Sequence, residues 1–224
     1  MRKKIIIITD SVSMPRPEIP YEDTWVYLIK KEFPHYDIID RTGRGSTSTR
    51  LVTEGGGGVD LLETYRPDIV ILQLGMAECA PRLCDKKGME FRIVSRMLPD
   101  GLRRRYIARV KRRRVRDPRV TDVAPEQFRR NIAAYFERAR AIPTRVIVIP
   151  ILPPTREYLR KSPHALGNVE RYNQIYRDTA RLFPNVEIVD PFRNGIDINE
   201  ISVDELHIGA RGSGIVFKAL KPLL

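Results

Sequence analysis

Five short apolar runs rich in β-branched residues recur along the chain. They are Lys4 to Thr9, Tyr36 to Ile39, Ile69 to Leu74, Val146 to Pro150 and Val186 to Val189. A strand of a parallel sheet is covered on both faces, so it reads as a continuous apolar run rather than as an alternation of apolar and polar residues. The pattern therefore predicts five buried strands.

The segments between these runs carry helix signals. Apolar residues recur at helical spacing, Pro125 stands where a first helical turn would begin, and Asn168 can cap a helix. The expected helices are Tyr21 to Lys31, Val59 to Tyr65, one from about Pro125, one capped by Asn168 and a last one from about Gly212 to Leu220. Strands alternating with helices predict an α/β fold with a five-stranded parallel sheet covered on both faces.

In such a sheet a ligand binds outside the carboxyl ends of the strands. The loops that follow the predicted strands are therefore the places to look for chemistry. These loops are Asp10 to Pro17, Arg41 to Gly58, Gly75 to Cys84, Pro150 to Thr155 and Asp190 to Gly209.

Composition places the chain among globular proteins with one sizeable core. It has 224 residues, of which 42% are hydrophobic, so we expect residues 1–224 to form a single domain. Its two cysteines, Cys79 and Cys84, make no disulfide framework and stand near no second Cys or His cluster, so neither a metal nor a cofactor is expected. The apolar start is too short for a signal peptide and no run approaches a membrane span. We expect a cytoplasmic protein.

The net charge of +12 is concentrated in one segment. Residues 102–119 contain ten Lys or Arg against the single acid Asp117, and Leu102, Tyr106, Ile107 and Val110 follow an approximate helical spacing. A basic amphipathic helix suits an anionic membrane surface or an acidic polymer. We therefore expect a basic helical insertion at about 88–119 that lies near the loops following the strands. Through Arg103 to Arg119 it would place the chain at the periphery of a membrane. A solvated helix that pairs with acids of a partner subunit stays an alternative, and no motif points to nucleic acid.

Two short segments at opposite ends of the chain carry the candidate chemistry. Ser11 follows the first predicted strand, and Asp204 precedes His207 by three residues. If 204–207 form a turn, Asp204 can accept the Nδ1 proton of His207 and leave Nε2 to accept the Ser11 hydroxyl proton. This arrangement predicts a serine hydrolase, although each residue alone is more often a turn or structural residue.

The loop after the second strand, Arg41 to Thr49, is rich in glycine and hydroxyl residues. Glycines let backbone N–H groups face an anion without obstruction. A dinucleotide fingerprint does not fit, because the third glycine is missing and the loop follows the second strand. We therefore assign Gly45 as an oxyanion donor, with a plain surface loop as the alternative.

These motifs resemble the blocks of the SGNH hydrolases, the GDSL-type esterases and acyl transferases. Thr9-Asp10-Ser11 stands for the nucleophile block, Gly45 for the second, Gly75-Met-Ala-Glu78 for the third and Asp204 to His207 for the last. The resemblance covers nearly the whole chain. It implies a flavodoxin-like three-layer α/β/α sandwich, a covalent acyl-enzyme with Ser11 and Gly45 amides as oxyanion donors, and no metal.

The third block departs from the family pattern, because Ala77 stands where the family has an asparagine whose amide holds the oxyanion. Loss of one such donor costs about 2.7–4 kcal/mol of transition-state stabilisation in other enzymes. The following residues, Glu78 to Arg82, look like a variant found in bacterial polysaccharide gene clusters. Glu78 and Arg82 are candidate substrate-binding residues, and an ion pair between them is the alternative.

The sequence thus predicts a serine-dependent ester hydrolase (deacylase) or acyl transferase, acting on an acylated carbohydrate or a lipid-linked glycan. The alternative is a non-catalytic or weakly catalytic module that binds an anionic membrane or an acidic glycan through its Arg-rich segment. Ala77 supports the alternative, whereas the retained Ser11, Asp204 and His207 oppose it. The sequence makes no prediction of oligomeric state.

Overall fold

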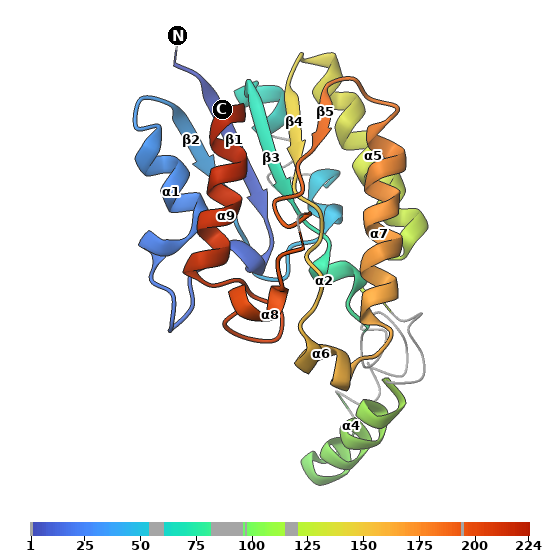
Figure 1. Cartoon of the computed structure of the whole chain (residues 1–224). Coiled ribbons are helices and arrows are strands. Elements are labelled where there is room, and N and C mark those ends of the chain that lie inside the picture. Colours follow the sequence, from blue (N-terminus) through green and yellow to red (C-terminus); the bar gives the residue numbers. More distant parts are fainter. Residues whose placement is uncertain (1, 54–60, 82–95, 97, 115–120, 194) are drawn as a thin grey trace.

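A five-stranded sheet, with all strands parallel, forms the centre of the protein (Figure 1). The computed structural model describes residues 2–53, 61–81, 96, 98–114, 121–193 and 195–224. The strands are β1 (Lys4–Thr9), β2 (Asp37–Asp40), β3 (Ile69–Gln73), β4 (Arg145–Val148) and β5 (Val186–Ile188), in the order β2-β1-β3-β4-β5. The predicted α/β class and its flavodoxin-like three-layer sandwich are confirmed.

Helices cover both faces of this sheet. The helices that form the layers are α1 (Trp25–Glu32), α5 (Pro125–Ala141), α7 (Ala165–Ala180) and α9 (Ala210–Leu220). Helix α1 packs beside α9 and α5 packs beside α7, and Figure 1 shows the two pairs on opposite sides of the sheet. Three shorter helices, α2 (Met76–Cys79), α6 (Arg156–Lys161) and α8 (Ile198–Ile201), lie toward the ends of the strand arrows.

Burial explains why these elements form. The four isoleucines Ile5 to Ile8 of β1 are at most 1% exposed, as expected of a central strand covered on both faces. Between α5 and α7, the ring of Phe128 lies 5.0 Å from that of Tyr172 and 4.9 Å from that of Tyr176, measured between centroids. Full burial of such side chains is worth about 1.5–3 kcal/mol each, so these contacts hold the helical layer on the sheet.

Two predicted helix starts differ from the structure. Thr24, not a residue near Tyr21, caps α1 by accepting the N–H of Tyr27. Helix α7 begins at Ala165, so Asn168 lies inside its first turns and the predicted cap at Asn168 is wrong. The Asn168 side chain instead donates to the carbonyl of Cys79 at 2.9 Å, a tertiary contact that the local sequence does not reveal.

The described part of the predicted basic insertion forms helix α4 (Asp100–Arg114). In Figure 1 it projects beyond α6 and α7, on the side to which the strand arrows point. Leu102 on this helix is 51% exposed. Apart from residues 96, 98 and 99, the rest of the 88–119 insertion, including Arg116 and Arg119, lies outside the described residues. Within the described chain, every helix is too short or too polar to cross a bilayer.

Candidate active site

Ser11 lies directly after the central strand β1, in a tight turn. The strand ends at Thr9, and a single 3-10 turn spans Ser11–Ser13. The side chain of Asp10 caps this turn by accepting the N–H of Val12 at 2.9 Å. The cap turns the chain sharply at the carboxyl end of β1, so the half-buried Ser11 is presented at the edge of the sheet.

A second turn near the other end of the chain holds His207. The Asp204 carboxylate accepts the backbone N–H groups of Leu206 and His207, both at 2.8 Å. It also lies 2.7 Å from the Nδ1 atom of His207 through its Oδ2 atom. An ionised carboxylate only accepts, so Nδ1 carries the proton and Nε2 is left as an acceptor.

These two turns meet at the carboxyl edge of the sheet. The Oγ atom of Ser11 lies 3.1 Å from the Nε2 atom of His207, although the two residues are 196 positions apart in sequence. The Ser11 hydroxyl can therefore donate to Nε2 while Asp204 holds the opposite ring nitrogen. This has the geometry of a Ser–His–Asp triad, and it unites the three residues singled out from the sequence.

The electrostatics of the site favour a neutral imidazole. Burial lowers the pKa of His207, and the charges of Arg16 and Arg44 lower it further, against the opposing effect of Asp204. Partial burial by itself would raise the pKa of Asp204, but the N–H groups of Leu206 and His207 and the imidazole bring it below its usual value. At neutral pH, His207 is thus an unprotonated acceptor beside an ionised carboxylate.

The loop carrying Gly45 is fixed to the sheet at both sides. The Gly43 N–H donates to the carbonyl of Thr9 at 3.1 Å, and the Ser48 N–H donates to the buried carboxyl group of Glu78. Gly45 has φ of +67°, a left-handed conformation that glycine adopts without strain. Among the described contacts, the N–H groups of Gly45 and Ser11 donate to no protein acceptor, so both are available to an oxyanion.

Helix α2, which follows β3, holds the position where the family pattern has asparagine. Gly75 precedes it with φ of +130°, and a Cβ there would collide with the Ile151 side chain, so only glycine fits. The N–H groups of Met76 and Ala77 donate to the Asp10 carboxyl group. Ala77 therefore offers the oxyanion neither a side-chain amide nor its backbone N–H.

Glu78 does not face a substrate. Its side chain is fully buried, and burial raises its pKa to about 8. The Ser48 hydroxyl next to it accepts the side-chain amide of Asn131 at 2.9 Å. The candidate substrate-binding role of Glu78 is corrected accordingly, since the residue ties α2 to the Gly45 loop from within the core. Arg82, its suggested partner, and Cys84 lie outside the described residues.

Two residues near the triad were not identified from the sequence. Arg16 donates from Nη2 to the carbonyl of Ser11 at 3.2 Å, and Arg44 directly precedes Gly45. In the sequence, only their positions could have suggested a role: Arg16 stands five residues after Ser11, and Arg44 stands next to Gly45.

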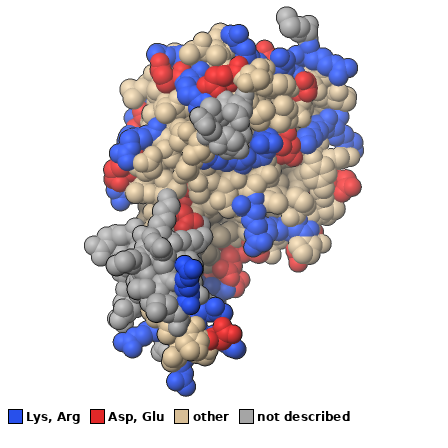
Figure 2. All heavy atoms as spheres, turned by 180° about the vertical axis from the view of Figure 1, so that it is seen from behind, with Lys and Arg blue, Asp and Glu red and all other residues tan. Residues whose placement is uncertain are grey.

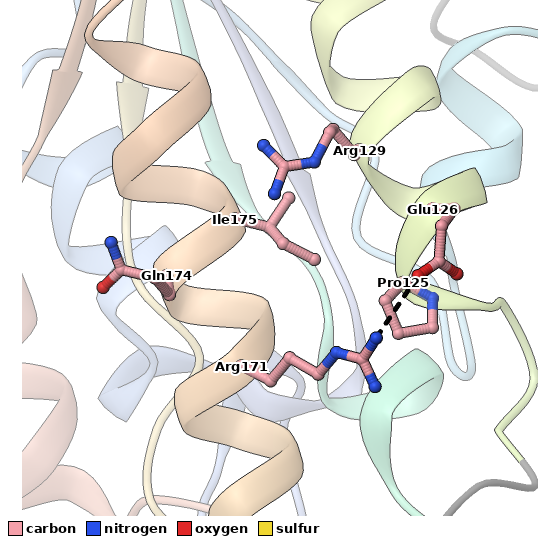
Figure 3. Close-up of a pocket in the computed structure, with 6 residues that line it drawn as sticks. All are labelled: Pro125, Glu126, Arg129, Arg171, Gln174 and Ile175. Carbon is pink, nitrogen blue, oxygen red and sulfur yellow. Dashed lines mark hydrogen bonds and ion pairs between the residues drawn. The ribbon is translucent and has the colours of Figure 1, made fainter.

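Figure 3 shows a hollow between α5 and α7 that none of the triad residues lines. Its lining residues are Pro125, Glu126, Arg129, Arg171, Gln174 and Ile175. Arg171 and Glu126 pair across it at 3.2 Å, and its lining residues include no Ser, Cys or His. Over the described residues, no group of three His, Cys, Asp or Glu is placed to hold a metal ion.

Comparison with known proteins identifies a family of hydrolases. The model of the GDSL-like lipase/acylhydrolase family matches residues 8–215. A comparison with curated proteins gave no significant match.

Solved structures share the fold at low identity. The structure of TesA is 20% identical with a TM-score of 0.58, covering 99% of this chain and 100% of its own. The psychrotrophic esterase EstA from Pseudoalteromonas sp. is 17% identical with a TM-score of 0.55, covering 98% and 95%. The acetyl xylan esterase AlAXEase is 14% identical with a TM-score of 0.62, covering 99% of each chain.

Proposed function

Because this chain belongs to the GDSL-like lipase/acylhydrolase family, we propose that it cleaves esters by a serine-dependent mechanism. The family makes it an ester hydrolase or acylhydrolase. One observation carries the mechanistic step, namely the 3.1 Å contact between Ser11 Oγ and His207 Nε2, with Asp204 2.7 Å from Nδ1.

In the first half of the reaction, Ser11 Oγ attacks the carbonyl carbon while its proton passes to His207 Nε2. The Asp204 carboxylate stabilises the imidazolium that forms. The tetrahedral intermediate then collapses, the bond to the alcohol oxygen breaks, and His207 returns the proton to the departing alcohol. The product is an acyl group on Ser11.

In the second half, His207 takes a proton from water or from an acceptor hydroxyl, and the resulting oxygen nucleophile attacks the acyl group. The bond between the acyl carbon and Ser11 Oγ then breaks, and His207 returns the proton to Oγ. Water gives hydrolysis, whereas a sugar hydroxyl gives acyl transfer. In both halves the Ser11 and Gly45 N–H groups hold the oxyanion. With Ala77 in the third place, this oxyanion hole has two donors instead of three, so we expect slow turnover of simple esters.

For the substrate, we propose an acylated carbohydrate or a lipid-linked glycan. The resemblance of Glu78 to Arg82 to a polysaccharide-cluster variant supports it. The fold likeness to a structure named as an acetyl xylan esterase agrees with this class of substrate. The proposal leaves open whether water or a sugar hydroxyl accepts the acyl group.

Helix α4 supports a second role, attachment to an anionic membrane surface. Arg104, Arg105 and Arg109 on it are exposed, as is Leu102. Figure 2 shows Lys and Arg side chains on the projecting end that carries this helix. The basic charge of α4 suits an anionic surface, whereas its apolar residues do not gather on one face, so the amphipathic pattern expected from the sequence is not met. This role accompanies catalysis or, in the alternative of a non-catalytic module, replaces it.

Labelling with a fluorophosphonate probe tests the serine mechanism directly. Wild type should be labelled and should hydrolyse a short-chain aryl ester, whereas Ser11→Ala should do neither and His207→Ala should lose both by at least about a thousandfold. His164→Ala, a histidine outside the triad, serves as the matched control. Labelling of Ser11→Ala at the wild-type rate would refute the assignment.

A further inference from the structure

We propose that the ester substrate carries an anionic group, a carboxylate or a phosphate, close to the scissile bond, and that Arg16 and Arg44 bind it. The inference rests on the proposed function of Ser11 and deepens it by assigning the charge of the substrate. It concerns two residues that play no part in the proton transfers described above.

Arg16 is held rigidly against the nucleophile. Its backbone pairs with that of Ile19 through two hydrogen bonds of 2.9 Å, and Ile19 is only 2% exposed, so the turn is anchored in the core. From this turn, Nη2 of Arg16 reaches the Ser11 carbonyl at 3.2 Å. The guanidinium group thus lies beside the residue that would attack the ester.

Most of the donor capacity of Arg16 is unused. A guanidinium has five N–H donors in a planar fork, and the contact with Ser11 occupies one. Its Nε atom is buried and has no hydrogen-bond partner among the described residues. A buried donor without an acceptor is costly, and a planar fork fits the two oxygens of a carboxylate or phosphate.

Arg44 approaches the same place from the second loop. It is exposed and directly precedes Gly45, and in the described structure its side chain forms no hydrogen bond or ion pair. Both arginines act electrostatically on His207. The bond from the Gly43 N–H to the Thr9 carbonyl brings the loop of Arg44 to the end of β1, so the two cations come to the site from two different loops.

Among the described contacts, Asp204 and Asp10 form no ion pair with either arginine, although the charge of Arg16 lowers the pKa of Asp10. Asp204 is engaged by the His207 ring and by two backbone N–H groups. Asp10 is 2% exposed and accepts N–H groups of Val12, Met76 and Ala77. The mouth of the site is left with positive charge, which raises the local concentration of anionic substrates and favours their binding.

A bound anion would also assist the chemical step. Arg16 and Arg44 disfavour the protonated form of His207 that arises during attack by Ser11. An anion placed between them offsets this effect, so an anionic substrate should show a higher kcat as well as a lower KM. An arginine with a purely structural role would give no such dependence on substrate charge.

The test compares matched esters that differ only in charge. On the alcohol side, 4-carboxyphenyl acetate is compared with 4-carbamoylphenyl acetate, and on the acyl side 4-nitrophenyl hydrogen succinate is compared with its methyl ester. Wild type should prefer the anionic member of at least one pair by about tenfold or more in kcat/KM, and the preference should shrink as salt is added. The pair that shows it identifies the side of the ester that bears the charge.

Four variants assign the preference to the two arginines. Arg44→Gln, which breaks no described contact, should reduce the preference severalfold. Arg16→Gln should reduce it further, and Arg16→Lys should keep part of it. Arg140→Gln, with the same charge change on α5, is the control and should leave it unchanged.

The failure of this inference is distinguishable from the failure of the proposed function. Turnover that requires Ser11 but ignores substrate charge would overturn the anionic substrate and leave the serine mechanism intact. A preference that survives both Arg44→Gln and Arg16→Gln would overturn the role of the arginines. Turnover that is equal in wild type and Ser11→Ala would remove both proposals.

Discussion

Ala77 stands at the position that the sequence aligns with the asparagine of the third SGNH block, beside the two proposed oxyanion donors Ser11 and Gly45. It is half-buried on α2, and its own N–H donates to Asp10. An asparagine at this position would project an amide from the same helix toward the Ser11 turn without needing that N–H. Ala77→Asn should therefore raise kcat on a small neutral ester, by up to about a hundredfold if the amide is well placed.

The measurement for Ala77→Asn is kcat and KM on 4-carbamoylphenyl acetate. Ala77→Gln, whose amide is one methylene further out, is the matched control and should gain less. A kcat at or below that of wild type would mean that the amide at position 77 does not reach the developing charge. It would contradict the view that Ala77 leaves the oxyanion hole one donor short.

His207 sets the pH dependence. Its pKa is lowered from 6.5 by burial and by the two arginines, so the neutral form required for proton acceptance persists to a lower pH than in a free imidazole. Activity should rise with pH through a limb centred below 6.5 and then level off. In Arg16→Gln the limb should move to higher pH, because one cation that disfavours imidazolium is gone. The profile of kcat/KM against pH measures both shifts, and a limb that moves the other way would contradict the assignment.

At the scale of elements, α2 connects the loops that form the site. Asp10 of the first loop binds its first N–H groups, and Glu78 within it binds the second loop at Ser48. This explains why two carboxyl groups are buried beneath a hydrolase site. They hold the Ser11 turn, the Gly45 loop and α2 in one rigid unit, and each is driven toward its protonated form by burial.

Glu78 should therefore make stability depend on pH. Its pKa is 4.5 when exposed and about 8 in the folded protein, so between these values the folded chain holds a proton that the unfolded chain has released. The free energy of unfolding is highest below that window and falls as the pH rises through it, by at most about 5 kcal/mol at 1.4 kcal/mol per unit. Asp10, raised from 3.8 to about 6, adds to the lower part of the fall.

Urea unfolding at about pH 5 and about pH 8 measures this contribution. In Glu78→Gln, which retains an acceptor for the Ser48 N–H, the difference between the two values should shrink markedly. Glu126→Gln, an exposed acid on α5, is the control. If the difference in the free energy of unfolding between the two pH values were the same in wild type and Glu78→Gln, Glu78 would be ionised in the folded state.

Helix α4 makes a separate prediction, because it projects from the helical layers. Replacing Arg104, Arg105 and Arg109 together by Gln should weaken binding to phosphatidylglycerol vesicles by roughly a hundredfold, at about 1 kcal/mol for each basic residue at an anionic surface. Ester hydrolysis in solution should be unchanged. A matched triple on other helices, Arg129, Arg177 and Arg181 to Gln, is the control. Binding that is indifferent to lipid charge and salt would exclude the membrane role.

For the molecule as a whole, the sequence predicts the features that depend on a few neighbouring residues. The isoleucines of β1 predicted its exact bounds, because a central strand is apolar throughout. The Ser11 turn and the 204–207 turn were recognisable because each is complete within a few residues. The predicted cap at Asn168 was wrong, because the Asn168 side chain donates a hydrogen bond to a residue distant in sequence, at the Cys79 carbonyl.

The features that the sequence could not provide depend on long-range burial. Nothing near Glu78 in the chain says that its carboxyl group is enclosed beside Ser48, thirty positions earlier. Arg16 is one arginine among many until its contact with the Ser11 carbonyl is known. The charge of the active-site mouth, and with it the expected class of substrate, therefore emerges only from the three-dimensional arrangement.

The contact between Ser11 and His207 across 196 residues also makes catalysis a reporter of folding. During synthesis, β1 is made before the segment between α8 and α9, so Ser11 has no base until that segment has docked against it. Local unfolding of that segment alone would abolish catalytic activity while the five strands stay paired. In a urea titration, fluorophosphonate labelling should therefore decrease before the far-ultraviolet circular dichroism changes. A chain in which the segment carrying His207 has not docked would have a folded sheet and no catalytic activity.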